Sequence, residues 1–175
     1  MRLAELMPPP DSPVRAYGDW KRFVSVNGFA PPDDYRMLIR EYGAGTFGDW
    51  LRLIEPFSPA GSFMDKVQVK CDKLRRSRQT SPQSDPGWPI WPEPGGLLPW
   101  AVTLTGEFVG WRTVGRPDTW TTLVWGQRGW GEYPVGTVGF LLGLAERSLG
   151  DPRFDDEGQN PFLDNGGRGF EPSRS

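Results

Sequence analysis

Few side chains in this sequence could carry out acid–base or nucleophilic chemistry. There is no histidine and a single cysteine, Cys71, which excludes Ser-His-Asp and Cys-His catalytic groups and zinc sites built on histidine or on several thiolates. Glu107, Asp118 and Glu132 could in principle supply a pair of carboxylates for hydrolysis, but no spacing singles out two of them. No P-loop or GxGxxG phosphate-binding motif is present. We therefore expect no enzymatic activity, no metal and no cofactor.

Cys71 falls on a predicted helix over residues 62–78. Ser62 and Asp65 have the spacing of a capping box at its start. Its apolar stripe consists of Phe63, Val67, Cys71 and Leu74. On this stripe the thiol is a core residue rather than a reactive group. The helix is also rich in Lys and Arg, which could contact phosphates, but a solvated charged face is the favoured interpretation and we expect no nucleic-acid binding.

The strongest strand signals lie in the second half of the chain. Apolar and polar residues alternate with the period of a strand, and turn residues separate the segments. The predicted strands cover residues 98–104, 109–111, 120–125 and 130–135. Residues 120–125 are β-branched and aromatic on both faces, which predicts a central strand covered on two sides. The unit is predicted to be an antiparallel meander.

Helices and a hairpin surround this meander. Asp19 can cap a helix over residues 19–26, and Pro31-Pro32 before two acidic residues indicates a helix over residues 33–42. Residues 45–54 suggest a hairpin or edge strand. Thr137 can cap a closing helix that runs to residue 149. The expected fold class is α+β, with a mostly antiparallel sheet and helices packed against it.

One domain is expected for 175 residues. We place it at residues 19–149, preceded by an arm over residues 1–18 that Pro8-Pro9-Pro10 interrupts. Residues 150–175 read as a polar tail, which Phe154, Phe162 and Phe170 could fix in part. No apolar run is long enough to span a bilayer, and the N-terminus lacks the pattern of a signal peptide, so we expect a cytoplasmic protein without membrane contact.

The segment from residue 79 to residue 96 contains Trp88 and Trp91 among Pro, Ser and Gly. Tryptophans indicate an ordered loop rather than a free linker. The two rings could form an aromatic binding edge or could close the open side of the sheet. The second possibility is favoured, and the first stays open.

Several ordered motifs resemble the SUKH superfamily, of the Smi/Knr type. The motifs are residues 32–45 (PDDYRMLIREYGAG), residues 92–101 (PEPGGLLPWA), residues 106–111, residues 115–120 (GRPDTW) and residues 138–144 (VGFLLGL). The resemblance covers about residues 20–147. Trp88-Pro89-Ile90-Trp91 departs from the family pattern, and the arm, the basic helix and the tail lie outside it.

This resemblance implies a SUKH-like α+β fold without catalytic chemistry. Bacterial members are regarded as immunity proteins, which implies that this protein binds and neutralises a cognate toxin, a nuclease or deaminase, by covering its active surface. The alternative is a regulatory or scaffolding module without a toxin partner. The residues predicted to contact a protein partner are Trp88, Trp91, Trp111, Asp118, Trp120 and Glu132. We expect charge reversal by Asp118→Lys with Glu132→Lys to weaken toxin binding and to leave the melting temperature nearly unchanged.

Overall fold

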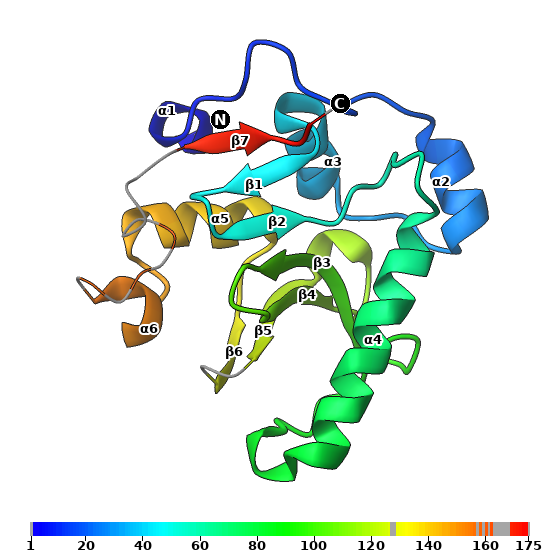
Figure 1. Ribbon diagram of the computed structural model, residues 1–175, viewed down its shortest axis with the longest axis vertical. Helices are drawn as coiled ribbons and strands as arrows, with labels where there is room; N and C mark the ends of the chain where they lie inside the picture. The colour runs from blue at the N-terminus through cyan, green and yellow to red at the C-terminus, as the bar shows by residue number, and fades with distance from the viewer. Residues whose placement is uncertain are drawn as a thin grey trace.

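The computed structural model describes residues 2–126, 129–156, 158, 160, 162 and 169–174. In this part of the chain seven strands form one antiparallel sheet, in the order β6-β5-β4-β3-β2-β1-β7 (Figure 1). The strands are β1 (Gly45–Phe47), β2 (Leu51–Leu53), β3 (Leu97–Thr103), β4 (Phe108–Arg112), β5 (Thr121–Gly126), β6 (Gly129–Tyr133) and β7 (Phe170–Pro172). The predicted α+β class and the antiparallel meander are confirmed.

Helices cover both faces of the sheet. The helices among the described residues are α1 (Arg2–Leu6), α2 (Trp20–Asn27), α3 (Asp33–Tyr42), α4 (Phe63–Thr80), α5 (Thr137–Glu146) and α6 (Pro152–Asp155), with short 3₁₀ turns η1 (Pro82–Ser84) and η2 (Pro117–Thr119). Of these, α4 and α5 pack directly on the sheet. Trp111 on β4 contacts α5, whereas Trp125 on β5 lies under Arg78 of α4. Trp111 is paired with Thr122, three residues before Trp125, so the two tryptophans point to opposite faces. Thus α5 and α4 lie on opposite sides of the sheet (Figure 1).

The central strand of the sheet is β3, which corrects the prediction that residues 120–125 occupy the centre. The hairpin of β1 and β2 pairs with β3 on the side away from β4, and β7 pairs with β1. Because these three strands extend the sheet beyond β3, the middle position belongs to β3, and β5 is the second strand from one edge. Residues 122–125 are nevertheless buried, because helices or loops cover both faces of β5.

The local signals for helix starts are confirmed at α2 and α4. The carboxylate of Asp19 accepts hydrogen bonds from two backbone N–H groups of α2, and Ser62 and Asp65 form a reciprocal capping box. At α5 the prediction is wrong: the N-cap is Gly136, and the Thr137 hydroxyl accepts a hydrogen bond from Trp111 instead. This helix also ends earlier, because Arg147 adopts a left-handed backbone conformation.

The terminal segments contribute to the same core as residues 19–149. Leu3 on α1 is fully buried, and α1 contacts α5. Phe154 and Phe162 are buried, and Phe170 packs against Tyr42 and Phe47 while its strand extends the sheet. The described residues of the predicted arm and tail therefore belong to the same compact unit, since their apolar side chains are buried in its core or pack against it. Among the described residues, no helix has the length and apolar character needed to cross a bilayer.

Candidate functional site

Two of the predicted contact residues, Trp111 and Trp120, are buried, which corrects their assignment to a partner-facing surface. Trp111 is fully buried beneath α5, and the ring of Tyr35 contacts it edge-on at 5.0 Å. Trp120 is only 7% exposed, and its Nε1–H donates to the carbonyl oxygen of Gly115 at 3.2 Å. Both indoles therefore belong to the core. The sequence could not show this, because alternation along a strand does not reveal whether a helix covers its outward face.

The predicted acidic residues are exposed, but each has a partner within the chain. The carboxylate of Asp118 accepts a 2.7 Å hydrogen bond from the backbone N–H of Asp33, and Glu132 forms an ion pair with Arg112. Glu107 differs from both, because it is buried and accepts hydrogen bonds from two threonine hydroxyls at the β3–β4 turn. Each of the three carboxylates thus has a different structural role: Asp118 binds the start of a helix, Glu132 forms an ion pair, and Glu107 binds the hydroxyls of a turn. Because Asp118 accepts the hydrogen bond from Asp33, we now expect its replacement to lower the stability of the fold, which differs from the expectation based on the sequence.

Trp88 and Trp91 are half-buried and pack against the core. Arg75 of α4 donates to the carbonyl oxygen of Trp91 at 2.7 Å, and Arg78 donates to that of Trp88. The loop therefore closes this side of the sheet, as the favoured interpretation expects. Trp88 also contacts Trp130, which is 51% exposed, so part of an aromatic edge remains at the surface.

Cys71 is buried on the inward stripe of α4, as predicted. Burial raises the pKa of its thiol to about 11, so the thiol is protonated at neutral pH. Among the residues that the structure describes, no three His, Cys, Asp or Glu side chains gather where they could hold a metal ion.

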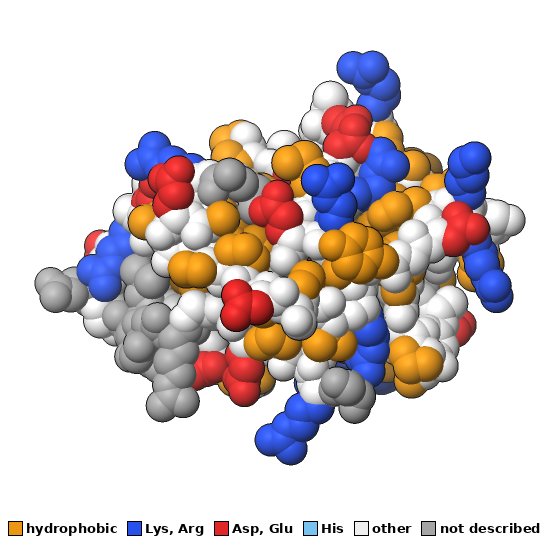
Figure 2. All heavy atoms as spheres, turned by 90° about the horizontal axis from the view of Figure 1, so that it is seen from above, with side chains coloured by type: hydrophobic (Ala, Val, Ile, Leu, Met, Phe, Trp, Pro, Cys, Tyr) orange, Lys and Arg blue, Asp and Glu red, His pale blue; other side chains and the backbone are white. Residues whose placement is uncertain are grey.

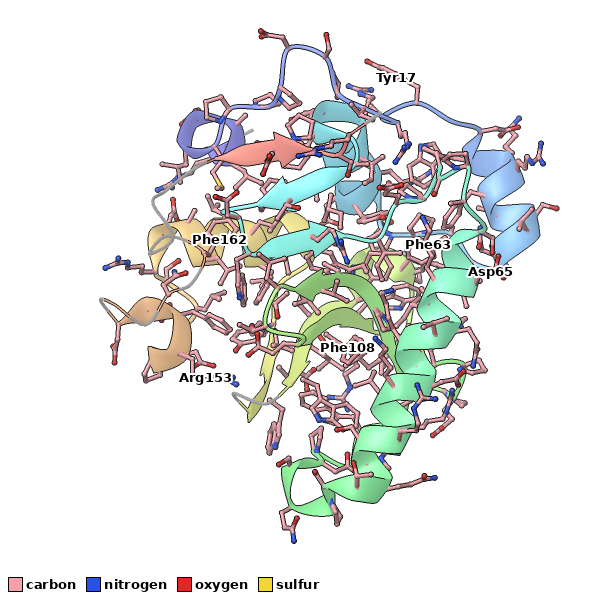
Figure 3. All side chains as sticks on the ribbon, viewed as in Figure 1. Tyr17, Phe63, Asp65, Phe108, Arg153 and Phe162 are labelled. Carbon is pink, nitrogen blue, oxygen red and sulfur yellow. The ribbon has the colours of Figure 1, made fainter. Side chains whose placement is uncertain are left out.

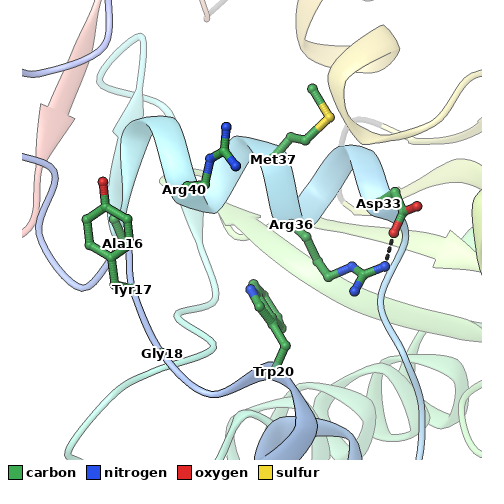
Figure 4. Close-up of a pocket in the computed structure, with 8 residues that line it drawn as sticks. All are labelled: Ala16, Tyr17, Gly18, Trp20, Asp33, Arg36, Met37 and Arg40. Atoms are coloured by element: carbon green, nitrogen blue, oxygen red, sulfur yellow. Dashed lines mark hydrogen bonds and ion pairs between the residues drawn. The ribbon is translucent and has the colours of Figure 1, made fainter.

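The surface feature best suited to recognition is a groove between residues 16–20 and the outward face of α3 (Figure 4). Its volume is about 440 Å³. It is lined by Ala16, Tyr17, Gly18, Trp20, Asp33, Arg36, Met37 and Arg40. We call these eight residues the α3 groove.

The local structure explains why these side chains face outward. Helix α3 buries one stripe in the core, so the residues on its other side, including Met37 and Arg40, are left at the surface. Trp20 is half-buried at the start of α2, and the rings of Phe23 and Phe57 hold it in place at centroid distances of 5.3 and 4.6 Å. Tyr17 projects from the segment before α2 at the outside of the molecule (Figure 3).

The α3 groove combines apolar surface with positive charge. Tyr17 is 76% exposed and Met37 is 49% exposed. Arg36 forms an ion pair with Asp33, whereas Arg40 is exposed and forms no ion pair within the described part of the chain. Aromatic residues, Met and Arg are enriched where proteins bind one another. On the face seen from above, hydrophobic side chains lie among charges of both signs (Figure 2).

Sequence reasoning did not identify the α3 groove. One signal was available, because Met37 is an apolar residue on the polar side of an amphipathic helix. The contribution of Tyr17 and Trp20 could not be read from the sequence, since it depends on how residues 16–20 cross the helix. Comparisons with protein-family models, curated proteins and solved structures found no match to this chain.

Proposed function

We propose that this protein is a non-enzymatic protein-binding domain of the cytoplasm, and that it acts as an immunity protein. It would bind a cognate bacterial toxin, a nuclease or deaminase, and neutralise it by covering the active surface. The observation that supports this proposal in the structure is the α3 groove, with its exposed aromatic, Met and Arg side chains. The resemblance of residues 20–147 to the SUKH superfamily supports the same class of function.

The α3 groove has the properties of a contact site that needs little reorganisation. Met37 and Arg40 project from a helix whose opposite face is buried, and Trp20 is held by two rings. Binding would therefore order few groups apart from Tyr17, whose side chain has only two rotatable bonds. An arginine beside apolar surface favours a partner that presents an apolar side chain next to a carboxylate. This replaces the acidic recognition surface expected from the sequence.

A regulatory or scaffolding module without a toxin partner is the second candidate. The observation that favours it is the exposed Trp130, whose ring lies 5.5 Å from that of Trp88. A host protein could dock on this aromatic edge. The edge lies at β6 and the loop before β3, and it shares no residue with the α3 groove.

The two candidates can be separated by affinity capture with the tagged full chain, in cells that also express the genes next to its own. The immunity proposal expects a stoichiometric partner that is toxic when it is produced alone. Replacing Tyr17 and Met37 together by Ala should weaken its binding at least tenfold, while Trp130→Ala should not. A non-toxic host protein whose binding is lost in Trp130→Ala would favour the regulatory module. Full binding of the toxic partner by the Tyr17/Met37 variant would show that the α3 groove is not its binding site.

A further inference from the structure

A second concave site lies between β2 and the N-terminal half of α4. Its volume is about 260 Å³, and the residues that matter for its chemistry are Arg52, Glu55, Lys66, Lys70, Val102 and Ser173. Arg52 is paired with Val102 across the β2–β3 ladder, so both side chains point to the α4 side of the sheet. Lys66 and Lys70 are one turn apart on α4, and Lys73 follows one turn later. We call this site the β2–α4 cleft. It shares no residue with the α3 groove.

Positive charge in the β2–α4 cleft exceeds negative charge. Glu55 is the one carboxylate among the residues that line it. That carboxylate already has an ion pair with Arg15 at 2.8 Å, a longer contact with Lys66 at 3.8 Å and a hydrogen bond from Ser173 at 3.3 Å. Within the described part of the chain, neither Arg52 nor Lys70 forms an ion pair with a carboxylate. No carboxylate therefore lies within 4.0 Å of either cation in the described residues, although the Lys70 ammonium donates a long hydrogen bond of 3.4 Å to the carbonyl oxygen of Lys66.

The cations in the β2–α4 cleft lower one another's pKa. Burial lowers the pKa of Lys70, and the charges of Arg52, Lys73 and Lys66 lower it further. Burial also lowers the pKa of Lys66, although Glu55 opposes this effect. Each shift means that the protonated form is less favourable here than in water. The chain has a net charge of −2, so its composition does not explain why cations accumulate at this cleft.

We propose that the β2–α4 cleft binds a phosphate-bearing small anion, with Arg52 and Lys70 as its main ligands and Lys66 beside them. A phosphate group carries about 1.5 to 2 negative charges at neutral pH, which is close to the summed charge of the two cations that lack an ion pair. Its oxygens accept hydrogen bonds from a guanidinium fork and from an ammonium group. The cleft has more room than one phosphate group fills, so a phosphomonoester fits as well as free phosphate.

The first test is thermal unfolding of the full chain in sodium phosphate, with sodium chloride of equal ionic strength as the reference. A specific site should raise the melting temperature in phosphate above that in chloride, and the rise should saturate. The rise should disappear in the Arg52→Gln/Lys70→Gln variant and persist in Lys21→Gln, which removes an exposed cation from α2. Glycerol 3-phosphate distinguishes the source: tighter binding than phosphate indicates a phosphomonoester, and equal or weaker binding indicates free phosphate. Equal melting temperatures in the two salts, or the same rise in the double variant, would overturn the proposal.

A second measurement uses the unmodified protein and does not depend on the folding of a variant. Limited acetylation by acetic anhydride at neutral pH, followed by mass spectrometry, should modify Lys70 readily, because its lowered pKa increases the neutral amine. Phosphate should slow acetylation of Lys70 at least threefold while that of Lys21 stays unchanged. Equal slowing at both lysines, or none at Lys70, would contradict binding in the cleft.

Discussion

The carboxylate of Asp118 accepts a 2.7 Å hydrogen bond from the backbone N–H of Asp33, a residue 85 positions earlier in the chain. The next residue, Asp34, accepts a 3.0 Å hydrogen bond from the backbone N–H of Val138 at the start of α5. The N-cap residue is Pro32 in α3 and Gly136 in α5, and neither residue caps its helix with a side-chain hydrogen bond. Distant carboxylates thus supply the acceptors that helix starts require. They connect η2, α3 and α5.

Removal of the Asp118 carboxylate should destabilise the fold. Asp118→Ala leaves an N–H at the start of α3 without its acceptor and removes a favourable charge near the positive end of the helix dipole, so we expect a loss of about 1 kcal/mol. Asp118→Asn retains an acceptor oxygen and should cost less. Urea denaturation followed by circular dichroism measures both variants. Unchanged stability in Asp118→Ala would show that the contact contributes nothing.

The two distant caps should be energetically coupled. Asp34→Ala removes the acceptor at the start of α5 and should also cost about 1 kcal/mol. Because Asp34 belongs to the turn of α3 that Asp118 caps, the double variant should deviate from the sum of the single variants by about 0.5 kcal/mol or more. A double-mutant cycle in urea tests this, and simple additivity would mean that the two helix starts are independent.

The buried hydrogen bond between Trp111 and Thr137 should be important for stability rather than for binding. The indole Nε1–H donates to the threonine hydroxyl at 2.9 Å. Thr137→Val preserves the side-chain shape but leaves the buried N–H without an acceptor, which should cost about 1–3 kcal/mol. Trp111→Phe removes the donor. Thr137→Val should therefore lower the free energy of unfolding by clearly less in the Trp111→Phe background than in the wild type. Equal costs in the two backgrounds would contradict this account.

The contact of Asp151 with Arg153 and Tyr133 predicts a pH dependence in the acid range. Burial alone would raise the pKa of Asp151, but hydrogen bonds from Arg153 and Tyr133 outweigh it and lower the pKa from 3.8 to about 2. Since the folded-state pKa is the lower one, this carboxylate stabilises the fold above pH 4, and its contribution is lost as the pH falls from about 4 to about 2. Asp151→Asn should flatten the stability profile in that range, as followed by urea denaturation. A profile as steep as that of the wild type would assign the effect to other carboxylates.

Two arginines of α4 should keep the loop before β3 closed on the sheet. Arg75 donates to the carbonyl oxygen of Trp91, and Arg78 donates to that of Trp88, forms an ion pair with Asp85 and covers the ring of Trp125. Replacement of both by Met keeps much of the apolar stem but removes these contacts. Amide hydrogen exchange over residues 82–92 should then accelerate severalfold, because this part of the loop opens locally. Arg76→Met, on the same helix, is the control and should leave exchange unchanged.

The sequence alone predicted the features that short segments decide. Asp19 caps α2, the pair Ser62 and Asp65 caps α4, and the meander of β3 to β6 forms where the alternation indicated. The burial of Cys71 followed from helical spacing in the same way. In each case the contacts or the periodic pattern involve residues that are close together in the sequence, so the sequence shows them without knowledge of the tertiary structure.

Only the tertiary structure decided which side chains are available for recognition. Trp111 is a core residue because α5 packs over it, and Asp118 is a helix cap because η2 meets the start of α3. The α3 groove and the β2–α4 cleft each combine elements that are separated in the chain. Burial and charge balance at such places depend on every element that packs there, and residue periodicity describes one element at a time.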